Sequence, residues 1–214
     1  MAESKFPGEF AGQPMNQKTL RGLAQKLETA SNEVSNFAWT QTFVCETLLF
    51  SVLSAEDEAH IRAHADRGAI PLSKVSTIQV SFDPSVLESP HAAYGPSSVS
   101  PLDVLAFTSE PRSKFLVVRP GSAVPGFEEL QNQARASLKA TRTMGAKPTT
   151  RLVWDHSYVD DAGTVYEVIL APNEESVRKY SRLAGFNQAS LITRITAVIN
   201  PSTAGAETEA WHTI

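Results

Sequence analysis

The chain has a single cysteine, Cys45, among its 214 residues. One cysteine excludes an intrachain disulfide and every zinc site that needs several cysteines. No apolar run approaches the roughly 20 residues of a membrane-spanning helix. Residues 1–12 also lack the apolar centre of a secretory signal. These absences predict a cytoplasmic protein with no membrane partner.

Positive charge is scarce as well. The 19 Lys and Arg residues are outnumbered by 23 Asp and Glu residues, which leaves a net charge of −4. A nucleic-acid surface needs clustered cations, so we expect no nucleic-acid partner. The hydrophobic fraction, 42%, is enough for a packed core, and the length allows one domain or two small ones.

Two stretches of the chain, 37–78 and 152–195, share one order of features. Each has a tryptophan-containing strand, an apolar strand, an acidic helix start, a helix and a short final strand. Trp39 aligns with Trp154, and Val44 aligns with Val159. A repeat of this length predicts two copies of one supersecondary unit.

A helix begins each copy, because apolar residues recur at helical spacing over 20–30 and again over 127–138. A strand at 114–119 precedes the second helix, and residues 160–163 suit a hairpin turn. The second copy therefore has the β-α-β-β-α-β order of a ferredoxin-like unit, which is an α+β fold with an antiparallel sheet. The opening strand of the first copy is less defined, because residues 5–10 contain Pro7 and Gly8.

This order divides the chain into four parts. We expect a first ferredoxin-like unit at 1–82, a Pro- and Ser-rich linker at 83–112, a second unit at 113–200 and a polar tail at 201–214.

The second unit resembles a family of small bacterial ferredoxin-like domains, one member of which binds nickel. The resemblance is carried by Trp154, by 157–159, by Tyr166, by 171–175 and by 184–186. The first unit is similar through Trp39, 43–44, 55–58, 61–65 and 70–71. The resemblance implies a tandem fusion, in which two units pack sheet against sheet as an intrachain pseudo-dimer, an α+β barrel. Such a chain would be a monomer or a homodimer.

The chain departs from the family at three positions. The family tends to have Glu at the end of the first strand, Cys in the third strand and His in the second helix. The second unit has Arg119, Glu167 and Tyr180 there, and the first unit keeps only the histidine, His64. The resemblance therefore makes His64 the metal candidate. We expect no cofactor, with nickel or a similar transition metal as the alternative.

Strand alternation places Trp154, His156 and Tyr158 on one face of their strand. Histidine titrates near neutral pH, so His156 is the candidate acid or base, and Tyr158 can donate a hydrogen bond to a developing oxyanion. The other reading of His156 is a core histidine bonded to a carbonyl group, and Arg119 can equally form a structural ion pair. The residues expected to bind the substrate are Trp39, Gln41, Phe43, Arg119, Trp154 and Glu167.

Three functions remain open from these residues. The first is a small-molecule enzyme that uses metal-free acid–base chemistry for isomerisation, cyclisation or elimination in an aromatic-lined pocket. The second is a nickel or transition-metal protein that uses His64, with His60, Cys45 and His156 as further ligands. The third is a noncatalytic ligand-binding or interaction module.

Overall fold

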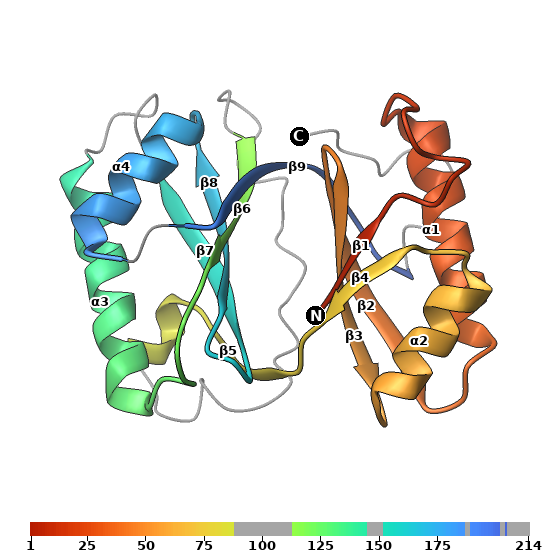
Figure 1. Cartoon of the computed structure of the whole chain (residues 1–214). Coiled ribbons are helices and arrows are strands. Elements are labelled where there is room, and N and C mark those ends of the chain that lie inside the picture. The colour runs from red at the N-terminus through yellow and green to blue at the C-terminus, as the bar shows by residue number, and fades with distance from the viewer. Residues whose placement is uncertain (88–112, 145–151, 187–188, 202–203, 205–214) are drawn as a thin grey trace. The chain divides into compact units, whose positions relative to one another are not determined.

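The computed structural model describes residues 1–87, 113–144, 152–186, 189–201 and 204. They form two compact units. One comprises the described residues of Met1–Ser76 and Ile195–Ile214, and the other comprises the described residues of Thr77–Arg194. Helices lie on one face of an antiparallel sheet in each unit (Figure 1), which confirms the predicted α+β class and its two ferredoxin-like units. Among the described residues, no helix is long and apolar enough to cross a membrane.

The described part of the first unit contains two helices and four complete strands. In chain order these are β1 (Ala2–Lys5), α1 (Gln17–Asn32), β2 (Phe37–Cys45), β3 (Leu48–Ala55), α2 (Glu58–Arg67) and β4 (Leu72–Val75). The strands run in the order β4-β1-β3-β2, so Ala2–Lys5 supplies the opening strand that the sequence left undefined. Asn16 caps α1 and Asp57 caps α2, because each side chain accepts a backbone N–H of the first turn.

The second unit begins with β5 (Ile78–Phe82) and a short 3-10 helix at Pro84–Leu87. It continues with β6 (Ser113–Arg119), α3 (Phe127–Thr143), β7 (Val153–Asp160), β8 (Val165–Ala171) and α4 (Glu174–Ala184). Its strands run in the order β6-β8-β7-β5. The expected linker, apart from 83–87, and most of the tail lie outside the described residues.

Two strands, β5 and β9 (Leu191–Ile199), cross the boundaries of the predicted units. β5, which lies within the segment 1–82 assigned to the first unit, pairs with β7 of the second. β9, expected at the end of the second unit, pairs through its later residues with β2 of the first. The compact units therefore differ from the expected 1–82 and 113–200. The difference arises because pairing between strands far apart in sequence leaves no local pattern.

At one end of the second unit, the backbone of the loop after β6 lies very close to the backbone of the β7–β8 turn. The predicted turn at 160–163 is present, with Gly163 at a φ of 79°, a conformation that glycine adopts without strain. A Cβ added to Gly163 would lie 2.2 Å from the carbonyl oxygen of Ala123. A Cβ added to Gly121 would lie 1.9 Å from the carbonyl oxygen of Gly163. The loop after β6 is thus held against the β7–β8 turn by two glycines.

Apolar side chains of the strands and helices form the cores of the two units. Leu23, Leu27, Trp39, Phe50, Leu116, Leu130, Trp154, Val168, Val177 and Ile195 are buried. Leu53, Ile61, Ile78, Val118, Leu138 and Leu170 are half-buried.

Candidate functional site

A β-bulge interrupts the tryptophan strand of each unit. The pairing register of β7 shifts between Trp154 and His156, and that of β2 shifts between Trp39 and Gln41. The indole N–H of Trp154 donates to the hydroxyl of Ser157 at 3.0 Å. In the first unit, Trp39 makes the equivalent bond to Thr42 at 2.9 Å. The two units therefore share a bulge with an indole–hydroxyl hydrogen bond at aligned positions.

The bulge corrects the expected division of faces. Trp154 and Ser157 point to the helix side of the sheet, where Trp154 packs with Leu130 and Ala134 of α3. His156 and Tyr158 then point to the other side. The single face expected to carry Trp154, His156 and Tyr158 does not exist, because the extra residue of a bulge reverses the alternation.

The first unit follows the same rule. Trp39 lies in the core that packs against α1, while Gln41 and Phe43 alternate to the opposite side of β2. On its helix side, the hydroxyls of Thr42 and Ser51 lie 2.7 Å apart, which extends the chain of bonds that begins at Trp39.

The side of the second sheet that carries His156 and Tyr158 is polar but buried. The two rings meet edge to face, with centroids 5.0 Å apart. Nδ1 of His156 lies 3.1 Å from Oδ2 of Asp155. Lys114 is also buried, and burial lowers the pKa of its ammonium group although the Asp155 carboxylate acts against this. The predicted catalytic pair, His156 and Tyr158, therefore lies in a buried cluster of polar side chains with Asp155 and Lys114.

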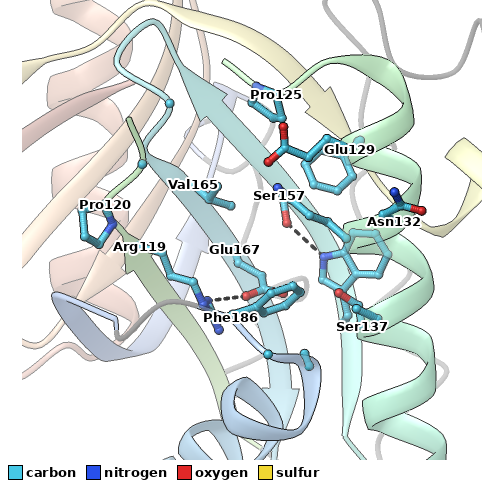
Figure 2. A pocket seen from close by; sticks show the side chains of 18 of the residues that line it. Arg119, Pro120, Pro125, Glu129, Asn132, Ser137, Ser157, Val165, Glu167 and Phe186 are labelled. Atoms are coloured by element: carbon cyan, nitrogen blue, oxygen red, sulfur yellow. Dashed lines mark hydrogen bonds and ion pairs between the residues drawn. The ribbon is translucent and has the colours of Figure 1, made fainter. Parts of the chain in front are cut away.

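The helix side of the same unit contains a pocket of about 380 Å³. Strand ends, the loop after β6, one face of α3 and the end of α4 form its walls (Figure 2). Of the predicted site residues, Arg119, Trp154 and Glu167 line this pocket, whereas His156 and Tyr158 do not. Other lining side chains are Phe82, Ser122, Glu129, Asn132, Gln133, Ser137, Ser157 and Phe186.

A buried ion pair forms the charged part of the pocket wall. Nη1 of Arg119 donates to Oε2 of Glu167 at 2.7 Å, and both side chains are about 95% buried or more. Nη2 of Arg119 donates to the hydroxyl of Ser181 at 2.7 Å. The hydroxyl of Tyr180 donates to Oε1 of Glu167 at 2.6 Å. Each oxygen of Glu167 thus accepts one bond and keeps a further lone pair.

Tyr180 is fixed in its protonated form. Burial raises the pKa of its phenol well above the ordinary value, and the neighbouring Glu167 carboxylate raises it further. A hydrogen bond from Ser137 and the charge of Arg119 act in the opposite direction. Tyr180 therefore serves as a hydrogen-bond donor to Glu167 rather than as a source of protons near neutral pH.

Phe186 covers the guanidinium group of Arg119. The Cζ atom of Arg119 lies 5.0 Å from the centre of the Phe186 ring. Phe186 follows directly on Gly185, which ends α4 in the left-handed conformation at a φ of 71°. The Nε atom of Arg119 is buried and has no acceptor among the residues that the structure describes. The Nε–H of Arg119, a strong donor in the pocket wall, therefore has no acceptor within the described part of the chain.

Arg119, Glu167 and Tyr180 are the three positions at which the second unit departs from the family that it resembles, one member of which binds nickel. They meet in this one cluster, but an arginine has no lone pair to give a metal, and its charge repels a divalent cation. The residues of the cluster therefore do not fit nickel.

His64 occupies the position in the first unit that Tyr180 occupies in the second. It is buried, stacks on Phe37 at 4.5 Å, and places Nε2 at 3.3 Å from the carbonyl oxygen of Leu27. Burial lowers the pKa of its imidazole. His60 contacts Asp57, and Cys45 is buried at the end of β2. Among the described residues, no three His, Cys, Asp or Glu side chains gather as metal ligands would.

Sequence reasoning missed several residues of the pocket. Ser157 was detectable, because a hydroxyl residue follows each aligned tryptophan by three positions. Tyr180 stood out only as a departure from the family. Ser137, Ser181 and Phe186 carry no sequence signal, since their roles arise from contacts between separate elements.

No family model and no curated protein matches this chain. Two solved structures with similar folds are a chlorite dismutase variant from Candidatus Nitrospira defluvii and a protein assigned as a monooxygenase from Lactobacillus acidophilus. The first is 9% identical, with a TM-score of 0.41 over 91% of this chain and 89% of that chain. The second is 6% identical, with a TM-score of 0.36 over 94% and 95%.

Proposed function

We propose that the chain is a small-molecule enzyme that performs metal-free acid–base chemistry in the pocket of the second unit. The observation that carries the proposal is the position of the Arg119–Glu167 pair, a buried carboxylate and guanidinium in the wall of a partly aromatic pocket. Small-molecule sites commonly combine apolar and aromatic walls with placed polar groups, and this pocket has side chains of both kinds.

Glu167 is the proposed proton acceptor. Arg119 and Tyr180 hold its two oxygens at 2.7 and 2.6 Å, which fixes the direction of the carboxylate. Its remaining lone pairs are available to a substrate proton. Isomerisation, cyclisation and elimination can all begin with removal of a proton next to a carbonyl group, and a positioned carboxylate is suited to that step.

Ser157 is the proposed stabiliser of the negative charge that this step creates on the substrate oxygen. Its oxygen accepts from the Trp154 indole, and its own O–H has no acceptor among the described residues. The electron pair of the broken C–H bond moves to the carbonyl oxygen, which then accepts a bond from Ser157. The proton passes to Glu167 and returns to carbon or oxygen.

Deuterium exchange tests the proposal. The probe is 1-hydroxy-2-acetonaphthone, whose acetyl group loses protons when it forms an enolate. We expect the protein in D2O to increase deuterium incorporation at the methyl carbon, measured by mass spectrometry. Glu167→Gln keeps the side-chain volume and should abolish the increase. The matched control is Glu175→Gln, an exposed glutamate at the start of α4, which should leave it unchanged.

A noncatalytic ligand-binding role uses the same pocket and is separated by the same experiment. Both oxygens of Glu167 already accept hydrogen bonds, which favours a purely structural carboxylate. Binding of the probe without any exchange above the rate in buffer would support that role and reject proton transfer.

A further inference from the structure

The charges around the pocket do not favour an anion. The guanidinium group of Arg119 is neutralised by Glu167 at 2.7 Å. The other charged side chain in the pocket lining is Glu129, which is exposed on the first turn of α3. The charged side chains that line this pocket in the described part of the chain therefore sum to a negative value, and a ligand carboxylate would lose hydration without gaining a free cation among them.

The uncommitted polar groups of the pocket are donors. The Nε–H of Arg119 and the O–H of Ser157 both lack acceptors among the described residues. They lie on either side of Glu167, because Ser157 pairs across the sheet with Glu167 and Arg119 lies on the strand beyond it. A buried donor without an acceptor is costly, so a ligand that supplies an acceptor is favoured.

The Phe186 ring now occupies the surface of Arg119 that a flat ligand would use. The ring lies 5.0 Å from Cζ of Arg119, and Phe186 remains half-exposed at the end of α4 (Figure 2). An aromatic ligand can replace this contact with an equivalent one, since a guanidinium group stacks on any aromatic face.

We propose that the ligand is a neutral, planar aromatic compound with a carbonyl oxygen, which displaces the Phe186 ring and accepts a hydrogen bond from Nε of Arg119. The inference rests on the proposed function for the location of the site. It does not depend on proton transfer, because it concerns recognition alone.

Two matched probes test the ligand class by isothermal titration calorimetry. They are 1-hydroxy-2-acetonaphthone, which is neutral at its acetyl group, and 1-hydroxy-2-naphthoate, which has a carboxylate at the same place. We expect the neutral probe to bind at least about tenfold more tightly. Glu129→Gln should strengthen binding of the naphthoate by about two- to fivefold and leave the neutral probe unchanged, since an exposed charge contributes little.

Two variants test the contacts with the neutral probe. Arg119→Lys keeps the charge beside Glu167 but removes the Nε–H, and we expect about tenfold weaker binding. Phe186→Leu removes the contact that the ligand must displace, and we expect binding about two- to fivefold tighter. Leu183→Ala, an exposed position near the end of α4, is the control and should change nothing.

Three results would overturn the inference. They are naphthoate binding as tight as that of the neutral probe, unchanged affinity in both Arg119→Lys and Phe186→Leu, and no binding of either probe. Tight binding of the neutral probe without deuterium exchange would instead reject the proposed reaction and leave the inference standing.

Discussion

Ser157 accepts a hydrogen bond from the indole of Trp154 across a β-bulge, at 3.0 Å. The bond fixes a hydroxyl group in the pocket wall, and the extra residue of the bulge places His156 on the other face of the sheet. Trp39 and Thr42 make the same bond in the first unit at 2.9 Å.

Removing the Ser157 hydroxyl should destabilise the fold. Ser157→Ala leaves the buried indole N–H without an acceptor, which costs about 1–3 kcal/mol in the free energy of unfolding. Ser157→Thr restores the hydroxyl in the form that the first unit uses and should recover most of the loss. Urea denaturation followed by circular dichroism measures both variants. Equal stability of Ser157→Ala and the wild type would show that the bond contributes nothing.

The buried phenol of Tyr180 predicts a loss of stability at alkaline pH. Its pKa is raised in the folded state above the ordinary value of 10.0, so the folded state binds the proton more tightly than the unfolded state. The resulting stability is fully present below that ordinary value and is lost as the pH rises through the higher folded pKa.

Tyr180→Phe isolates this effect. The variant should be less stable than the wild type near neutral pH, by about 1.5–3 kcal/mol for a bond to a charged group. It should also show a smaller decrease in stability above the ordinary tyrosine pKa. Thermal unfolding across that range compares the two proteins, and parallel pH curves would contradict the prediction.

Two of the glycines that line the pocket, Gly163 and Gly185, predict unequal costs of substitution. Gly163→Ala meets the Ala123 carbonyl oxygen at 2.2 Å and also strains a positive φ, so the loop beyond β6 must move. Gly185→Ala has a positive φ but no atom within 4 Å of its added Cβ. We expect a cost of about 1 kcal/mol for Gly185→Ala and a clearly larger one for Gly163→Ala. Melting temperatures of the two variants provide the comparison.

His64 predicts a loss of stability in mild acid. Burial lowers the pKa of its imidazole below 6.5, so the unfolded state binds the proton more readily than the folded state. Stability should therefore be complete above that value and decrease as the pH falls below it. His64→Gln should reduce this dependence, whereas His60→Gln, at a less buried position on the same helix, should retain it. Identical pH profiles of His64→Gln and the wild type would contradict the assignment.

Substitutions of His156 and Tyr158 test which face of the second unit's sheet performs the proposed chemistry. His156→Gln and Tyr158→Phe convert the strand to the pattern of Gln41 and Phe43. Because neither residue lines the pocket, we expect deuterium exchange to persist in both variants. Exchange lost at these positions, with a melting temperature like that of the wild type, would move the reaction to the face that carries Asp155 and Lys114.

The sequence predicted the order of elements well, because helical spacing, alternating strands and turn residues are local signals. It failed where one residue changes the geometry. The bulge beside Trp154 moved His156 and Tyr158 away from the tryptophan, and simple alternation has no means of showing an extra residue. The sequence also could not predict the contacts among Arg119, Glu167 and Tyr180. These contacts depend on how β6, β8 and α4 pack together.

The pairing of β9 with β2 has a consequence for biosynthesis. Thr196 donates to the carbonyl oxygen of Val44, a residue 152 positions earlier. The sheet of the first unit therefore remains open at β2 while the ribosome produces the whole second half. That edge is a site for wrong pairing with other nascent chains during this time. A chain released before β9 is complete should bind chaperones, because the edge of β2 then has no partner strand, even when the N-terminal residues themselves have folded.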